Sequence, residues 1–355
     1  MSINLLTKKE KESQFESFIH SPNFGMDTYI TLSLCLINVN YGVQTIDLYW
    51  SLIDKITTVK PFDYPRHELN VKQHVALDTV VKTMIMIETL FVMIDSLSKG
   101  YSYVSKQITR YGNGLPKQII GKIYSKEYDL YKIIQLPDID TLDLSPNENK
   151  FLKKIFDSTL ELVWSKLTKF ANFYEKYDIV YLKTKHGLSI QTGAHFSNSD
   201  GLDFKKSYMR ALDHRQKNNL YKNSFRVKQF SPINSWYNIQ SMVKFNDKFK
   251  KELFSVASEL FEITEFIVES NLTYARNCGQ RYLPIERISE QEFSLFILSD
   301  KTYSETESKY MKKIAEKILS SMNTKDLSIS IGEEFNEKIQ RSFVEDSVTT
   351  MRIDD

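Results

Sequence analysis

The sequence has few cysteines, prolines and glycines, and each shortage excludes a class of protein. Its two cysteines, Cys35 and Cys278, provide neither a disulfide framework nor a closely spaced pair of metal ligands, which fits a reducing cytoplasm. Eleven glycines and eight prolines in 355 residues exclude collagen-like and low-complexity chains. Long apolar runs are also missing, because polar and charged residues interrupt both 28–53 and 76–94. We therefore expect buried helices of a soluble cytoplasmic protein in these two segments, and no membrane partner.

A large net charge is missing as well. The 47 basic and 45 acidic residues leave a formal net charge of +2. The chain as a whole therefore shows no electrostatic preference for nucleic acid or for a membrane surface. Any such preference must come from a local patch of charge.

Apolar residues, which are abundant, recur at spacings of three and four in three long segments. This spacing predicts three long helices that bury their apolar stripes against one another in a bundle. The stripes are Leu77, Val80, Met84, Ile87, Phe91 and Ile94; Phe156, Leu160, Val163, Leu167, Phe170, Tyr174, Tyr177 and Tyr181; and Met242, Phe245, Phe249, Leu253, Val256, Leu260, Ile263 and Ile267.

Shorter elements are expected between the long helices. The pattern predicts short helices at about 28–55, 115–123 and 304–322, and Ser145-Pro146-Asn147-Glu148 is suited to begin the second long helix. Alternating residues predict short strands within 188–235 (near 188–192 and 225–227), at 293–298 and at 327–331. The expected fold is mostly α, a helical bundle of three long and several shorter helices with a small β insertion.

Changes in composition along the chain suggest four parts. They are a helical bundle core at 1–187, a basic insertion of loops and short strands at 188–235, a long helix with a small α/β addition at 236–332, and an acidic tail at 333–355. The tail has seven acidic and three basic residues, a net charge of −4. It either pairs with a basic surface or remains free.

The stretch Lys183-Thr-Lys185-His186-Gly187 has two interpretations. Basic residues complement the C-terminus of a helix, and glycine suits the position just after it, so the stretch is typical of a helix end. Alternatively, His186 is a catalytic acid or base, with Lys183 and Lys185 supplying positive charge.

The catalytic interpretation rests on a resemblance. A pair of long, aromatic-rich helices that ends in lysine-histidine-glycine, over about residues 66–187, resembles the helical core of HEPN-type proteins (higher eukaryote and prokaryote nucleotide-binding domain). The resemblance implies a ribonuclease that acts around His186, with RNA as substrate. The active members carry an arginine shortly before the histidine, whereas this chain has Ile179, Val180 and Tyr181 there. Lysine does not reproduce the planar fork of arginine, so the resemblance favours a diverged relative.

The segment 205–228 has the largest local charge in the sequence. It contains eight basic residues and the single acid Asp213, a net of +7, with aromatic residues between them. Basic residues bind phosphates and aromatic rings stack on bases, so this composition is typical of a surface that binds single-stranded nucleic acid. Alternatively, the basic side chains simply extend over a helical surface or pair with acids elsewhere. The candidate binding residues are Lys205, Lys206, Arg210, Arg215, Lys217, Tyr221, Lys222, Arg226 and Lys228.

Histidines and carboxylates cluster between residues 186 and 214 without the spacing of a known metal motif. Asp213 and His214 are adjacent, so on a helix they would point about 100° apart. We therefore predict no metal and no cofactor. The cluster comprises His186, His195, Asp200, Asp203, Asp213 and His214.

Three interpretations of function remain open. The leading one is a non-enzymatic binding or regulatory module that contacts RNA or DNA through 205–228. The second is a diverged HEPN-like ribonuclease, and the third is a structural protein whose aromatic-rich helix faces form a homo-oligomer.

Overall fold

The structure is a computed structural model. It describes residues 24–56, 65–100, 104–109, 114–185, 190–196, 202–213, 238–276, 281, 284–289, 292–300 and 302–321. The mostly α, helical-bundle fold class is confirmed. Within the described ranges, no helix combines the length and the apolarity needed to cross a membrane.

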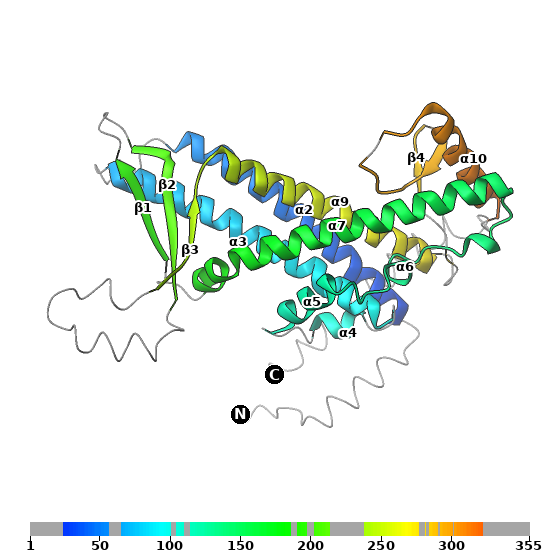
Figure 1. Cartoon of the computed structure of the whole chain (residues 1–355), viewed down its shortest axis with the longest axis horizontal. Helices are drawn as coiled ribbons and strands as arrows, with labels where there is room; N and C mark the ends of the chain where they lie inside the picture. The colour runs from blue at the N-terminus through cyan, green and yellow to red at the C-terminus, as the bar shows by residue number, and fades with distance from the viewer. Residues whose placement is uncertain are drawn as a thin grey trace, which may run out of the picture. The chain divides into compact units, whose positions relative to one another are not determined.

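Four long helices dominate the fold (Figure 1). They are α2 (Phe24–Lys55), α3 (Pro65–Ser98), α7 (Pro146–Lys185) and α9 (Asp247–Arg276). The sequence predicted three long helices, and α2, expected as a shorter one, has 32 residues. The shorter elements are α4 (Val104–Thr109), α5 (Leu115–Tyr124), α6 (Leu130–Ile133), the 3-10 helix η2 (Ile139–Thr141) and α10 (Glu305–Ser321).

The predicted helical stripes form the core. The α3 stripe from Leu77 to Ile94 is buried throughout, and so is the α7 stripe from Phe156 to Tyr181 except for the half-buried Leu160. The third stripe is buried from Phe245 to Ile267, but its first two members lie before the helix. Met242 lies in a strand and Phe245 lies between this strand and the helix, which begins at Asp247. Asn246 explains the change, because its Oδ1 accepts a hydrogen bond from the Phe249 amide (2.9 Å) and so caps the helix.

The chain folds into two compact units. Unit 1 contains residues up to Ile133 together with Leu160–Val268, and unit 2 contains Ile134–Thr159 together with the residues from Glu269 onward. The four parts expected from composition stay a prediction.

In unit 1, α2 and α3 lie side by side (Figure 1). Gly42 of α2 permits their close approach, because a Cβ atom at this position would lie 2.6 Å from Cγ of Met86 in α3. The core face of α2 follows a strict seven-residue repeat, in which Leu32, Val39, Ile46 and Ile53 are all at most 2% exposed. This packing fixes which side of α2 is buried.

Three lysine–glutamate pairs join α7 and α9 in unit 1, and we call them the α7–α9 ladder. Lys166 pairs with Glu262 (3.4 Å), Lys169 with Glu259 (2.6 Å), and Lys176 with Glu252 (2.7 Å). Residue numbers rise along α7 as they fall along α9, so the two helices are antiparallel. All three lysines belong to α7 and all three glutamates to α9.

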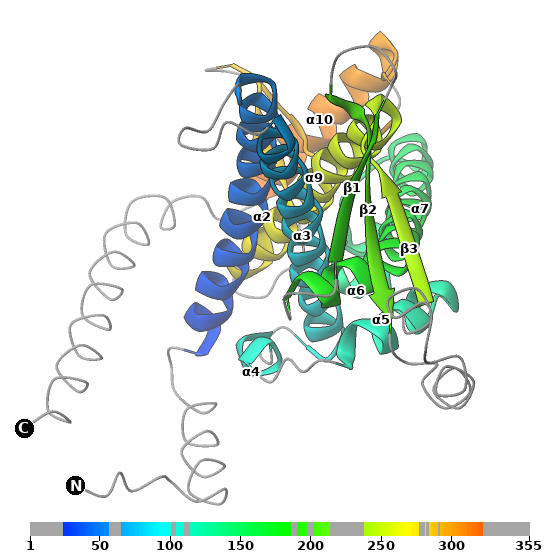
Figure 2. The same cartoon turned by 90° about the vertical axis from the view of Figure 1, so that its left-hand side faces the viewer.

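Unit 1 also contains a three-stranded antiparallel sheet. Its strands are β1 (Ile190–Phe196), β2 (Leu202–Asp213) and β3 (Asn238–Lys244), with β2 in the centre. Helix α3 packs beside β1 and β2 (Figure 2). The sheet confirms a strand near 190, but β2 is much longer than any strand the sequence suggested. The strand expected at 225–227 lies outside the described residues.

In unit 2, Glu148 links the start of α7 to α10. The Ser145 hydroxyl accepts a hydrogen bond from the Glu148 amide (3.5 Å), and Glu148 Oε2 accepts one from the Ser145 amide (2.8 Å), so the predicted helix start is confirmed as a capping box. Lys313 and Lys317 of α10 contact the same carboxylate at 3.0 and 2.8 Å. Hydrogen bonds from Lys317 and from the Ser145 amide hold the pKa of Glu148 well below its usual range, although burial opposes them.

Unit 2 also contains a short hairpin beside α10. The hairpin pairs β4 (Ile285–Arg287) with β5 (Phe293–Leu295), and β5 packs beside α10. The strand predicted at 293–298 and the helix predicted at 304–322 are therefore confirmed, as is the helix predicted at 115–123 in unit 1. The strand expected at 327–331 lies outside the described residues.

Candidate functional site

The lysine-histidine-glycine stretch follows directly on α7. Lys183 and Lys185 belong to the last turn of this helix, which ends at Lys185. His186 lies outside the described residues. Tyr177 and Tyr181, two turns and one turn earlier, are 2% and 4% exposed and belong to the core. The catalytic interpretation of His186 stays a prediction.

The basic segment contributes its first part to the sheet. Lys205, Lys206 and Arg210 lie in β2, the central strand. The other candidate binding residues lie outside the described residues: Arg215, Lys217, Tyr221, Lys222, Arg226 and Lys228.

Successive residues of a strand belong to opposite faces of its sheet, and this alternation sorts the residues of β2 by charge. The even-numbered positions are Leu202, Phe204, Lys206, Tyr208, Arg210 and Leu212. They include two bases and two aromatic residues but no acid. The odd-numbered positions from 203 to 213 contain both acids of the strand, Asp203 and Asp213, together with Lys205.

The register extends the even-numbered face over the neighbouring strands. Tyr208 pairs with Gly193 in β1 and with Lys244 in β3, and Arg210 pairs with Gln191 and Met242. Directly paired residues of antiparallel strands share a face. Lys244 is exposed. The β1–β2 register is irregular between Ala194 and Phe196, opposite residues 203–206, so Lys206 is assigned to this face by alternation along β2 alone. We call the positions Lys206, Tyr208, Arg210 and Lys244 the basic sheet face.

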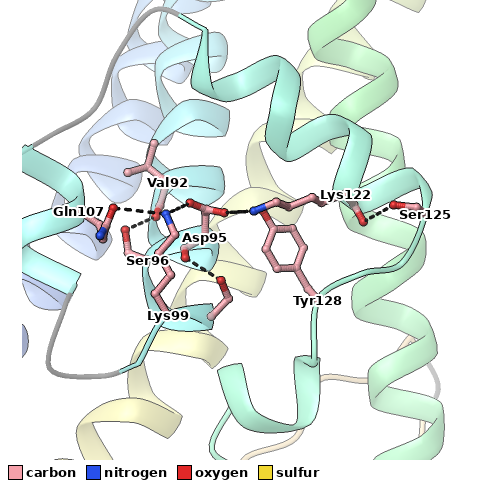
Figure 3. Close-up of polar contacts among 9 residues, drawn as sticks. Val92, Asp95, Ser96, Lys99, Gln107, Lys122, Ser125 and Tyr128 are labelled. Carbon is pink, nitrogen blue, oxygen red and sulfur yellow. Dashed lines mark hydrogen bonds and ion pairs between the residues drawn. The ribbon is translucent and has the colours of Figure 1, made fainter.

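A buried carboxylate near the end of α3 forms a second polar cluster, which the sequence did not predict (Figure 3). Asp95 accepts hydrogen bonds from Lys99 Nζ (2.6 Å), Lys122 Nζ (2.8 Å) and the Tyr128 hydroxyl (3.0 Å). Lys99 Nζ also lies 3.3 Å from Gln107 Oε1 of α4. The cluster therefore connects α3 with α4, α5 and the segment before α6.

The environment of Asp95 moves the pKa values of Asp95 and Tyr128 away from neutral pH. Burial would raise the pKa of Asp95, but hydrogen bonds from Lys122, Lys99 and Tyr128 outweigh it and leave the pKa below its ordinary value. Burial and the charge of Asp95 raise the pKa of Tyr128. A general acid or base works best with a pKa near the working pH, and these two shifts lead away from it. The arrangement suits a structural connection between helices.

A third cluster surrounds Glu88 of α3. Its two carboxylate oxygens accept hydrogen bonds from the hydroxyl groups of Tyr174 (2.8 Å) and Tyr181 (3.0 Å) of α7. Glu88 also lines a hollow of about 210 Å³, whose other walls are mainly apolar: Cys35, Asn38, Ile85, Thr89, Val92 and Ile108. Burial raises the pKa of the Cys35 thiol to about 12. The thiol is therefore protonated at neutral pH and is not an activated nucleophile.

The sequence contained only part of the signal for these clusters. Lys99 follows Asp95 by four residues, which is the spacing of an ion pair on one helix face. Lys122, Tyr128, Tyr174 and Tyr181 meet their carboxylates only through tertiary packing.

The described part of the chain contains no group of three or more histidine, cysteine, aspartate or glutamate residues placed to hold a metal ion. Among the residues of the candidate metal cluster, Asp203 and Asp213 lie on β2 and His195 on β1, while His186, Asp200 and His214 lie outside the described ranges. In comparisons with known proteins, no family model, no curated protein and no solved structure matches this chain.

Proposed function

We propose that this chain is a binding module for single-stranded nucleic acid, and that the basic sheet face is its contact surface. The observation that carries the proposal is the separation of charge in β2. The strand alternation groups Lys206 and Arg210 with Tyr208 and leaves both acids of the strand on the opposite face.

This combination suits a single strand of nucleic acid. Lysine and arginine neutralise the phosphate backbone, and tyrosine offers a flat ring on which a base stacks. Sheet surfaces that bind RNA use the same division of labour, with aromatic residues on central strands. Lys244, paired across from Tyr208, adds a third basic residue to the face.

Helix α3 contacts β1 and β2, and the proposal requires that it covers the odd-numbered face of the sheet, so that the basic sheet face stays accessible. The basic residues beyond Asp213 follow directly on β2 in the sequence and extend the same positive charge.

Two adjacent lysines provide a matched test. Lys206→Glu and Lys205→Glu make the same change in the same strand, but on opposite faces of the sheet. With a fluorescent 20-nucleotide oligo(dT) or oligo(rU) as probe, we expect Lys206→Glu to weaken binding about tenfold and to reduce the salt dependence, while Lys205→Glu has a much smaller effect. Tyr208→Ala should weaken binding about tenfold without changing the salt dependence. Circular dichroism confirms that each variant is folded.

Two outcomes would overturn the proposal. The first is the absence of oligonucleotide binding by the wild-type chain at low salt. The second is an equal loss of binding in Lys205→Glu and Lys206→Glu, which would mean that total charge and not the sheet face determines binding.

A further inference from the structure

Helix α2 has a second apolar stripe, on the side opposite its core face. Five large apolar residues on this side are 40–59% exposed, and they follow one another at spacings of three, four, seven and four. Residues at these spacings lie on one face of a helix. We call Leu34, Ile37, Tyr41, Leu48 and Leu52 the α2 strip.

The α2 strip is free of charge over most of its length. Residues 28–46 contain no aspartate, glutamate, lysine or arginine, and Gln44 fills the gap in the spacing between Tyr41 and Leu48. The water-facing side of a helix normally carries charged residues at about a quarter to a third of its positions. An uncharged, apolar face of five turns is therefore typical of a surface that another protein covers.

The fold prevents the helix from burying this strip by rotation. Leu32, Val39, Ile46 and Ile53 occupy the core side, and Gly42 is in close contact with Met86 of α3. Turning the strip inward would expose this buried repeat. Among the described residues, none covers the outer face, so burying both apolar faces of α2 requires a further packing partner on the outside.

We propose that the α2 strip is the contact surface of a homodimer, in which α2 of one copy lies along α2 of a second copy. The lack of charge is compatible with a second copy, because an uncharged strip meets itself without like-charge repulsion. Gln44 of one copy can also pair with Gln44 of the other, because an amide group both donates and accepts hydrogen bonds. A single polar residue within an apolar helix seam is known to select the register of pairing.

The surface beside the strip fits the same occupant. The hollow of about 210 Å³ is bordered by Asn38 of α2 and by Ile85 of α3, both of which are exposed. Tyr41 is 59% exposed, and Lys82 Nζ lies 4.2 Å from its ring centroid. In a two-fold pair, each copy presents both a hollow and protruding apolar side chains, as a self-complementary interface requires.

The size of the surface determines how tight the dimer is. The strip is about 27 Å long and roughly 10 Å wide, which is small beside the 800 Å² or so that each partner buries in a stable interface. Ile85 and the hollow add to it, but the total stays below the area of a standard interface. We therefore expect a dimer that dissociates on dilution within the micromolar range.

Sedimentation of the full chain across a series of concentrations tests the proposal. The wild-type chain should shift from monomer to dimer as its concentration rises. Ile37→Glu and Leu48→Glu should each weaken dimerisation at least about tenfold, because pairing would bury an unpartnered charge. Lys251→Glu, at an exposed position of α9, is the matched control and should dimerise like the wild type. Thermal unfolding checks that the variants remain folded.

Cross-linking tests the same contact independently of affinity. A cysteine at Gln44, in the middle of the strip, should form a disulfide-linked dimer under mild oxidation, and a cysteine at Lys251 should not. The proposal is wrong if the wild-type chain remains a monomer at all concentrations, even if another protein binds the strip. It is also wrong if a dimer forms that neither strip substitution weakens.

Discussion

Lys122 of α5 donates a hydrogen bond to Asp95 of α3 across 2.8 Å, although 27 residues separate them in the sequence. The carboxylate is 2% exposed and the lysine 39%. Because Lys99 and Tyr128 also donate to Asp95, one carboxylate accepts three hydrogen bonds at the end of α3. This arrangement leads to the first prediction.

Asp95→Asn should lower the free energy of unfolding by about 2 kcal/mol. Removing one partner of a fully buried ion pair costs about 3–5 kcal/mol, but both lysines here are partly exposed and can be rehydrated, which reduces the loss. Urea unfolding followed by circular dichroism measures the change. Asp129→Asn is the control, because Asp129 pairs with Lys132 at the surface across 3.5 Å. Equal effects of the two substitutions would contradict the structural role of Asp95.

Glu148 should make the stability of the chain sensitive to acid. Its pKa is lowered in the folded state, so the folded state binds fewer protons than the unfolded state as the pH falls through the usual range of a glutamate. The contribution is complete above about pH 5, and it is lost as the pH falls below the unfolded value of about 4.3 toward the lower folded value.

A comparison of wild type and Glu148→Gln over a series of pH values tests this dependence. The difference between their urea midpoints should be constant between about pH 5 and 7 and should shrink below about pH 4. Glu305→Gln removes a carboxylate whose side chain is 85% exposed, and its profile should follow that of the wild type. A difference that grows on acidification would show that the sign is wrong.

Replacing each of two helical glycines by alanine should change the stability of the chain in opposite directions. Gly42→Ala places a Cβ atom against Met86 and should destabilise the chain by about 1–3 kcal/mol, which exceeds the helix propensity gained. Gly121→Ala in α5 meets nothing within 4 Å and should stabilise it by up to about 1 kcal/mol. Thermal unfolding of both variants tests the pair. A stabilising Gly42→Ala would mean that α2 and α3 are not in close contact there.

Cys35 should be protected from alkylation in the folded chain. With a pKa raised to about 12 by burial, only about one thiol in ten thousand is ionised at pH 8. Peptide mass spectrometry after iodoacetamide treatment should find Cys35 unmodified without urea and modified above the unfolding midpoint. Rapid labelling in the native state would show that α2 separates readily from α3.

The helices were predictable because their signal is local. An apolar residue every three or four positions marks a helix face whatever it packs against, and the α3 and α7 stripes became core almost without exception. The error at Met242 has the same origin. Its spacing to Phe245 and Phe249 happens to be helical, and the pattern alone does not reveal that Asn246 caps the helix.

The sheet and the polar clusters were less predictable because their signals are not local. In β2, apolar, aromatic and basic residues alternate with a mixture of acidic, basic, small and apolar ones, so neither face shows the simple apolar alternation of a half-buried strand. The sequence identified Lys206 and Arg210 as candidate binding residues but did not show on which face of the sheet either position lies. The positions of Lys122 and Tyr128 beside Asp95 depend on how three helices pack, which no spacing along the chain encodes.

The α7–α9 ladder also bears on how the bundle assembles. All four long helices offer apolar faces of similar spacing, and apolar contact discriminates poorly between them. The antiparallel pairing of α7 with α9 brings opposite charges together at all three positions, so these pairs favour α9 as the neighbour of α7 while the chain folds.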